Sequence, residues 1–210
     1  MDRAGKSGGH PRRLKSRFDI AEFRRTLSLY PTGVAVIGTR GAQGALVALT
    51  CNSFSSVSLS PPLVLWCLAL YSPSLPAFLQ ASHFSVNFLS TEQETLSRNF
   101  SSPVVNRFAG VKHAIGEGGV PLVADCAAHL ECRNETRSYI GDHVIFIGHV
   151  VRFARSARIP LLFSAGRYSD LDDRTRHAVR ERTAPRPPAR KVARNRKPLK
   201  ENGFLSVVNC

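Results

Sequence analysis

The residues best suited to chemistry form a dense run of small hydroxyls between Thr50 and Ser60. Each hydroxyl donates one hydrogen bond and accepts two, so this run predicts a partner such as a phosphate-bearing ligand. The alternative is a Ser-rich turn that caps its own backbone. Cys51 lies in the same run, where it either lines a site or packs as a small hydrophobic residue. The hydroxyl-bearing residues are Thr50, Ser53, Ser55, Ser56, Ser58 and Ser60.

A second cluster with chemical potential is Gly141-Asp142-His143, directly before the apolar run that starts at Val144. Gly141 permits a tight turn, Asp142 can orient the imidazole, and the His143 ring can donate a hydrogen bond to a ligand. The alternative is a histidine that caps a turn. No GxSxG motif is present, so a nucleophilic serine is not expected. No CxxC pair or His/Cys cluster has zinc spacing, so no metal is expected.

The elements that must position these clusters are mostly short β-rich runs. Seven strands with few helices predict a mainly β domain with a closed or sandwiched antiparallel sheet. Asp19 followed by Glu22 predicts a helix N-terminus, and the helix then ends at Pro31. No βαβ alternation and no GxGxxG appear, which argues against a Rossmann domain. The predicted strands are 34–37, 45–49, 63–68, 84–89, 127–133, 144–153 and 161–163, and further short helices are expected at 75–81 and 92–100.

The composition is that of one globular domain in a chain of 210 residues with 43% hydrophobic residues. No apolar run is long enough for a membrane-spanning helix, and the basic N-terminus is followed by no signal-peptide core. The five cysteines are an odd number, which favours reduced thiols and a cytoplasmic location.

The net charge of +14 belongs to the two ends of the chain. Residues 18–170 carry twelve basic and ten acidic side chains, so the central region is nearly neutral. Residues 1–17 and 172–210 are expected to be basic, disordered tails, the second one rich in Pro and Arg. They could touch nucleic acid non-specifically, but no aromatic residues interleave the arginines, so nucleic-acid binding is not the expected function.

The residues from Phe18 to Leu171 carry a specific pattern. It consists of PTGVAVIGT, LTCNSFSSVSLSPPLVLWCL, FSVNFLS, NRFAGV, LECRNE with GDHVIFIGHV, and PLLFSAGRYSDL, in that order. This combination resembles the flavin reductase-like family, which supplies the reductase components of two-component flavin-dependent monooxygenases. The resemblance covers residues 18–171, the expected domain between the tails.

The resemblance implies a Greek-key-like split β-barrel, usually a homodimer, that binds FMN or FAD non-covalently. It implies reduction of that flavin by NADH or NADPH and delivery of the reduced flavin to a monooxygenase component. The sequence does not separate FMN from FAD or NADH from NADPH, and it does not identify the monooxygenase. The alternatives are a non-catalytic flavin-binding split barrel and, less favoured, a nucleic-acid-associated protein; neither implies a membrane.

The resemblance also implies site residues. His143 is the expected nicotinamide-positioning, catalytic residue, with Gly141, Asp142 and Tyr168 near the nicotinamide. Flavin contacts are expected at Thr32, Gly33, Val34, Thr50, Cys51, Asn52, Ser53, Ser56, Ser58 and Asn87.

The flavin phosphate is expected at Ser53, Ser58 and Arg107, because hydroxyls and a guanidinium bind phosphate. The family commonly has Asp where this chain has Ser60 and Asn106. Ser60 and Asn106 are therefore not expected to perform a role that needs a carboxylate.

Overall fold

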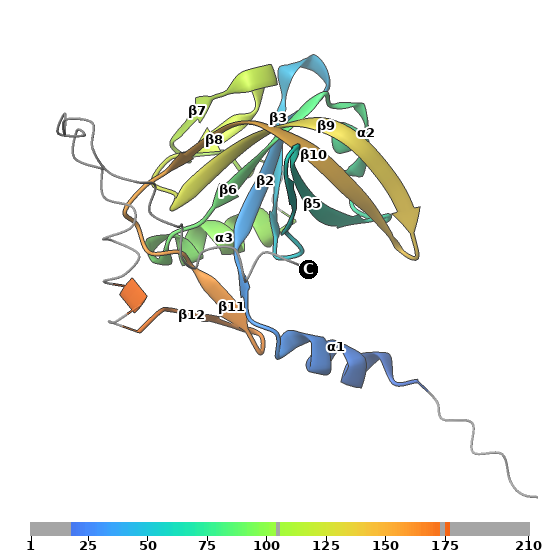
Figure 1. The fold of residues 1–210 in the computed structure, drawn as a ribbon, viewed down its shortest axis with the longest axis vertical. Helices are drawn as coiled ribbons and strands as arrows, with labels where there is room; N and C mark the ends of the chain where they lie inside the picture. Colours follow the sequence, from blue (N-terminus) through green and yellow to red (C-terminus); the bar gives the residue numbers. More distant parts are fainter. Residues whose placement is uncertain (1–17, 104–105, 173–174, 177–210) are drawn as a thin grey trace, which may run out of the picture.

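The computed structural model describes residues 18–103, 106–172 and 175–176. Strands predominate over these residues, as predicted, and seven of them form one antiparallel sheet in the order β3-β2-β6-β9-β10-β5-β4 (Figure 1). The expected tails lie outside the described residues, except for positions 172, 175 and 176. The strands of this sheet are β2 (Ala35–Arg40), β3 (Leu46–Cys51), β4 (Ser55–Leu59), β5 (Pro62–Ala69), β6 (His83–Phe88), β9 (Ala128–Ile140) and β10 (His143–Arg155).

The large sheet interleaves strands that are distant in the sequence. β10 pairs with both β9 and β5, and β6 pairs with both β2 and β9. The β9–β10 ladder shifts register between Ile147 and Gly148 and again between Val150 and Arg152, and such bulges increase the local twist. The sheet curls as a split barrel, but among the described strands no ladder joins its edges β3 and β4. The predicted class, mainly β with a few short helices, is confirmed, and of the two sheet arrangements expected the closed one is not found in the described part of the chain.

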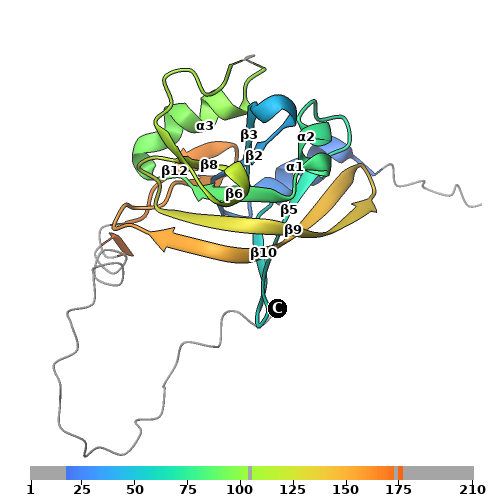
Figure 2. The same ribbon diagram turned by 90° about the horizontal axis from the view of Figure 1, so that it is seen from above.

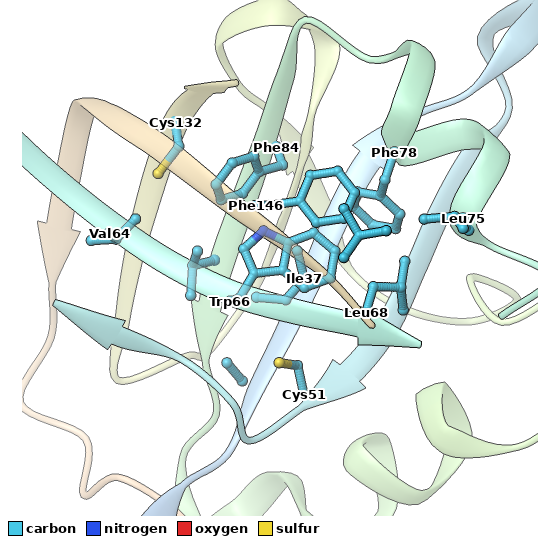
Figure 3. Packing of buried hydrophobic residues seen from close by; sticks show 13 residues of the cluster. Ile37, Cys51, Val64, Trp66, Leu68, Leu75, Phe78, Phe84, Cys132 and Phe146 are labelled. Atoms are coloured by element: carbon cyan, nitrogen blue, oxygen red, sulfur yellow. The ribbon is translucent and has the colours of Figure 1, made fainter. Parts of the chain in front are cut away.

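The core inside the curved sheet is aromatic (Figure 3). The rings of Trp66 and Phe146 stack with centroids 4.7 Å apart, and Phe78 meets Trp66 edge-on at 4.9 Å. All three side chains are fully buried. The alternation of buried and partly exposed residues along β5 places Trp66 on the core face, as its period-two pattern requires.

Three α-helices accompany the described strands: α1 (Ile20–Ser28), α2 (Leu75–Gln80) and α3 (Glu94–Ser101). Asp19 caps α1 as predicted, because its carboxylate accepts hydrogen bonds from the backbone N–H groups of Ala21 and Glu22. The predicted helix at 92–100 is present, but its first turn is the 3₁₀ turn η2 (Thr91–Gln93). Seen from above, α3 lies on the opposite side of the molecule from β9 and β10 (Figure 2).

A small sheet flanks α3 and continues from the start of β2 (Figure 1). It consists of β1 (Thr32–Gly33), β11 (Leu162–Ser164) and β12 (Arg167–Ser169), in the order β1-β11-β12. Thr32 pairs with Phe163, and Phe163 pairs with Tyr168, so these three residues form one row across the sheet. A further hairpin joins β7 (His113–Ile115) to β8 (Pro121–Val123), and 3₁₀ turns η1 (Ala42–Gly44) and η3 (Glu117–Gly119) occur in loops.

The structure places a strand in the hydroxyl run, where the sequence analysis predicts none. Residues Ser55–Leu59 form the edge strand β4, which pairs with β5. The turn preference of serine is overridden because pairing with the apolar strand β5 satisfies the backbone of this segment. Strands β1, β7, β8 and β12 were also not predicted, since two- or three-residue strands have too few positions to show a period of two.

Candidate functional site

A cleft of about 260 Å³ opens where the end of β3 meets α3 and the β11–β12 hairpin. We call it the β3–α3 cleft. It has one wall from Thr50 and its neighbours and another from the two aromatic rings of the small sheet. Its lining residues are Val34, Thr50, Cys51, Asn52, Ser97, Ser101, Phe163 and Tyr168.

A second hollow of about 200 Å³, the β1 hollow, lies at the start of β1. Asn52 lines both hollows, so the two meet at that residue. Thr32 also lines the β1 hollow, and its Oγ1 is buried without a hydrogen-bond partner among the described residues. A buried hydroxyl without a partner is costly in a folded protein, and a polar ligand atom would remove that cost. The hollow is lined by Tyr30, Pro31, Thr32, Gly33, Ala35, Asn52, Phe54 and Phe88.

Ser97 of α3 connects the two walls of the β3–α3 cleft. The Thr50 hydroxyl donates to the backbone carbonyl of Ser97 at 2.6 Å. The Ser97 Oγ lies 2.9 Å from the hydroxyl of Tyr168. The cleft therefore has polar groups that are already oriented by neighbouring elements, which is typical of small-molecule sites.

Ser53 holds the loop after β3 against β5. Its Oγ accepts a hydrogen bond from the backbone N–H of Cys67 at 2.9 Å and lies 3.1 Å from the Sγ of Cys51. Burial raises the pKa of both the Cys51 and the Cys67 thiols. Both cysteines are therefore neutral thiols near pH 7, which fits packing better than nucleophilic chemistry.

The turn between β9 and β10 carries the second predicted cluster. Gly141 has φ +61°, a conformation that favours glycine. The Nδ1 of His143 lies 2.6 Å from the Oδ1 of Asp142, and this hydrogen bond is the main reason why the pKa of Asp142 is lowered. His143 pairs with Ala69 of β5, two residues along the strand from Cys67. His143 and Ser53 therefore both contact strand β5, but Gly141, Asp142 and His143 line neither hollow.

Seven of the predicted site residues are brought together around the two hollows. The predicted residues in this group are Thr32, Gly33, Val34, Thr50, Cys51, Asn52 and Tyr168. They come from three separate segments of the chain, so the sequence pattern and the tertiary structure converge on one place. Gly141, Asp142 and His143 form a second group at the β9–β10 turn.

Asn87, a predicted flavin-contact residue, uses its side chain for hydrogen bonds within the protein. Asn87 is fully buried, its amide donates to the carbonyl of Val36 at 2.9 Å, and its Oδ1 accepts from the N–H of Val123 at 2.9 Å. Asn87 therefore joins β6, β2 and β8. A buried amide can meet its hydrogen-bonding needs either from a ligand or from the backbone, and the sequence does not show which.

The three residues predicted to bind the flavin phosphate, Ser53, Ser58 and Arg107, also have hydrogen-bond partners within the protein. Arg107 donates to the carbonyls of Ser102 and Ala48, both at 2.9 Å, and lines a different hollow of about 600 Å³. The Ser58 Oγ accepts from the N–H of Ser60, and Ser53 is held by Cys67. Ser56 lies on the same edge strand as Ser58, outside the β3–α3 cleft and the β1 hollow.

Three residues that line the cleft were not predicted as site residues from the sequence: Ser97, Ser101 and Phe163. Ser97 and Ser101 are four residues apart in α3, so they share one helix face toward the cleft. Their spacing of four residues was a usable signal, but serines at this spacing are common in helices. Phe163 was recognised only as part of a strand, and its place in the cleft depends on its pairing with Thr32 and Tyr168.

The family model described as "Flavin reductase like domain" matches residues 27–172. The chain belongs to the flavin reductase-like family. The match spans both hollows and the β9–β10 turn.

Relatives of known name agree with this family assignment. The chain is 40% identical over 146 residues to the FMN reductase (NADH) SmoA of Agrobacterium fabrum, covering 70% of this chain and 83% of that protein. It superposes with a TM-score of 0.71 and 38% identity on the NADH:FAD oxidoreductase of Streptomyces globisporus, solved in complex with NAD and FAD fragments. That match covers 74% of this chain and 94% of the other.

Some curated relatives are considerably longer. The chain is 36% identical to the reductase component of the flavin-dependent trigonelline monooxygenase of Acinetobacter baylyi, of which it covers 48%. It covers 49% of a Rhizobium meliloti relative, so it spans about half the length of some proteins that it matches.

The two hollows fit a flavin by their own chemistry. The unpartnered Thr32 hydroxyl and the Asn52 amide offer polar contacts. Phe54, Phe88 and Phe163 offer apolar walls for a flat aromatic ring. Within residues 18–172 as described, no cluster of three or more His, Cys, Asp or Glu side chains is placed to hold a metal ion. No helix in the described part of the chain is long and apolar enough to cross a membrane.

Proposed function

We propose that this protein is a flavin reductase that uses NADH or NADPH to reduce FMN or FAD and passes the reduced flavin to a monooxygenase component. The observation that carries the proposal is the meeting of the β3–α3 cleft and the β1 hollow at Asn52, with the unpartnered Thr32 hydroxyl beside it. The names of the relatives point to the same reaction.

The residues of the cleft position the reactants. When bound, the nicotinamide and flavin rings supply the chemistry, a hydride passing from nicotinamide C4 to flavin N5. Thr32 and Asn52 hold polar edges of the flavin, and the Phe163 and Tyr168 rings form the apolar wall that excludes water. The Asn52 amide, which lines both hollows, would donate to the flavin and stabilise the negative charge that reduction adds to it.

His143 has the proposed role of positioning the nicotinamide. Its Nδ1 is occupied by Asp142, so the Nε2 edge of the ring is the one directed to other partners. Its side chain is 43% exposed, which leaves it accessible to a ligand. The phosphate-binding role first expected for Arg107 is not part of this proposal.

We propose further that the protein is a homodimer whose interface includes α1. Phe18, Ile20, Phe23 and Leu27 are between 45% and 72% exposed, and no residue of α1 is buried in a single chain. The helix extends away from the sheet in Figure 1. Apolar faces of this kind are normally covered, and a second copy of the chain is the partner proposed here. We assign the protein to the cytoplasm, where its four described cysteines stay reduced.

The activity is tested by following NADH and NADPH oxidation with FMN, FAD or riboflavin added. We expect oxidation that depends on the added flavin, and release of the reduced flavin in an anaerobic filtration assay. Flavin binding without nucleotide oxidation would instead identify a non-catalytic flavin-binding protein. Steep weakening of binding to RNA with salt, without any flavin binding, would identify a nucleic-acid-binding protein.

The dimer is tested by light scattering on the purified protein. We expect a mass of two chains, and a mass of one chain after Leu27→Glu. The control is Ile115→Glu, which alters an equally exposed apolar residue on the β7–β8 hairpin. A monomeric wild type, or a dimer that survives Leu27→Glu together with Phe23→Glu, would contradict the proposal.

A further inference from the structure

Ser97 is hydrogen-bonded to both walls of the β3–α3 cleft. Its side chain is fully buried in α3. Its backbone carbonyl accepts the Thr50 hydroxyl at 2.6 Å, and its own Oγ lies 2.9 Å from the Tyr168 hydroxyl. One residue therefore connects a segment 47 positions earlier in the chain with a segment 71 positions later.

Among the described residues, the ring of Tyr168 also contacts a guanidinium and a second aromatic ring. The guanidinium of Arg98 lies 4.9 Å from the ring centroid, and the Phe163 ring meets it at 5.3 Å with an angle of 64°. Glu94 in turn holds Arg98 through a salt bridge of 2.7 Å. Packing contacts allow the ring to slide, whereas a hydrogen bond fixes the position of its hydroxyl. Among the described residues, Ser97 is thus the side-chain hydrogen-bond partner of the Tyr168 hydroxyl.

We propose that Ser97 is a positioning residue for the reaction, because it sets the separation of the Thr50 wall and the Tyr168 wall. This inference rests on the proposed function, in which flavin binds beside Thr50 and the nicotinamide lies near Tyr168. The nicotinamide and flavin rings react only when they stack at about 3–3.5 Å, so a small displacement of the Tyr168 wall weakens the productive binding of NADH and raises its KM. Ser97 acts through Tyr168 and touches neither reactive atom.

The two hydrogen bonds of Ser97 can be separated by mutation. Ser97→Ala removes the bond to Tyr168 and leaves the bond from Thr50, which goes to the backbone. Tyr168→Phe removes the same bond from the other end and keeps the ring. We expect each variant to raise the KM for NADH about 2- to 12-fold, the range that one neutral hydrogen bond supports. The flavin Kd, measured by fluorescence titration without NADH, should stay within about twofold of wild type.

The double variant provides the decisive comparison. If Ser97 acts only through Tyr168, Ser97→Ala combined with Tyr168→Phe should raise the KM no more than either change alone. The control is Ser102→Ala, a serine at the end of the same helix whose Oγ bonds the Asn99 carbonyl and does not line the cleft. It should keep the wild-type KM for NADH.

Several outcomes would overturn the inference. The first is a wild-type KM for NADH in Ser97→Ala. The second is a KM in the double variant that rises by the product of the two single increases. The third is a flavin Kd that rises as much as the KM. If Ser97→Ala does not fold, the comparison of Tyr168→Phe with Ser102→Ala still tests the hydrogen bond between Ser97 and Tyr168, because Tyr168 is only partly buried. A wild-type protein that shows no flavin-dependent NADH oxidation contradicts the proposed function, whereas an active wild type with an unaffected Tyr168→Phe contradicts this inference alone.

Discussion

The imidazole Nδ1 of His143 lies 2.6 Å from a carboxylate oxygen of Asp142, at a turn that Gly141 makes possible. The pair lies at the exposed end of the β9–β10 ladder, with Asp142 84% exposed. Its geometry fixes which edge of the imidazole faces away from the turn.

Replacing His143 by Ala should slow the reduction of bound flavin by NADH. The loss of one hydrogen bond corresponds to about a 2- to 12-fold effect, and misaligned rings enlarge it to about a hundredfold. Asp142→Asn should give a smaller effect in the same direction, because the ring remains but loses its carboxylate partner. Stopped-flow reduction under anaerobic conditions measures both. Flavin affinity is the control, and wild-type reduction rates in His143→Ala would assign His143 to a purely structural turn.

Replacing Thr32 by Val should weaken flavin binding without destabilising the free protein. The Thr32 Oγ1 is buried without a partner in the described structure, so a methyl group of the same shape removes no internal hydrogen bond. The flavin Kd should rise about 2- to 12-fold, while the free energy of unfolding without flavin stays equal or increases. Flavin titration and urea unfolding test the two parts. A loss of stability in the flavin-free variant would show that Thr32 has a structural partner.

Replacing Asn87 by Ala should destabilise the fold rather than act on flavin binding directly. The change leaves the buried Val36 carbonyl and Val123 N–H without their 2.9 Å partners. We expect the free energy of unfolding to fall by about 2 kcal/mol or more. Urea unfolding measures this loss. Unchanged stability together with weaker flavin binding would restore Asn87 to the site.

The buried cysteines predict a loss of stability at high pH. Burial raises the pKa of Cys126 and of Cys132 from 9.0 to about 12. Because the folded state keeps these thiols protonated, they contribute to the free energy of unfolding. This contribution is fully present below pH 9.0 and is lost as the pH rises towards about 12. Urea unfolding across this range measures the loss, and Cys132→Ala should flatten the dependence. An equally steep dependence in that variant would contradict the argument.

The four described cysteines should differ in their reactivity toward thiol reagents. Cys67 is only partly buried, whereas Cys51, Cys126 and Cys132 are buried. In the native protein at mildly alkaline pH, Cys67 should therefore react with a thiol reagent before these three. Mass spectrometry of partly labelled protein identifies the modified residue. Earlier labelling of Cys126 or Cys132 would be inconsistent with the packing of the core.

The sequence by itself determined the local elements and the family. Most strands and the cap at Asp19 could be read from residue patterns, because a period of two and a capping side chain depend on neighbours in the chain. The segments around Thr32, Thr50 and Tyr168 were also recognisable, since each carries a compact motif.

Only the tertiary structure decided which polar groups are free for a ligand. Asn87 and Arg107 have the chemistry of site residues, but their side chains are used by backbone groups of distant strands and loops. Ser97 carries no motif, yet it joins the two walls of the cleft. A hydrogen-bonding group has the same identity in either role, and its partner is chosen by contacts between segments far apart in the chain, which local sequence patterns do not contain.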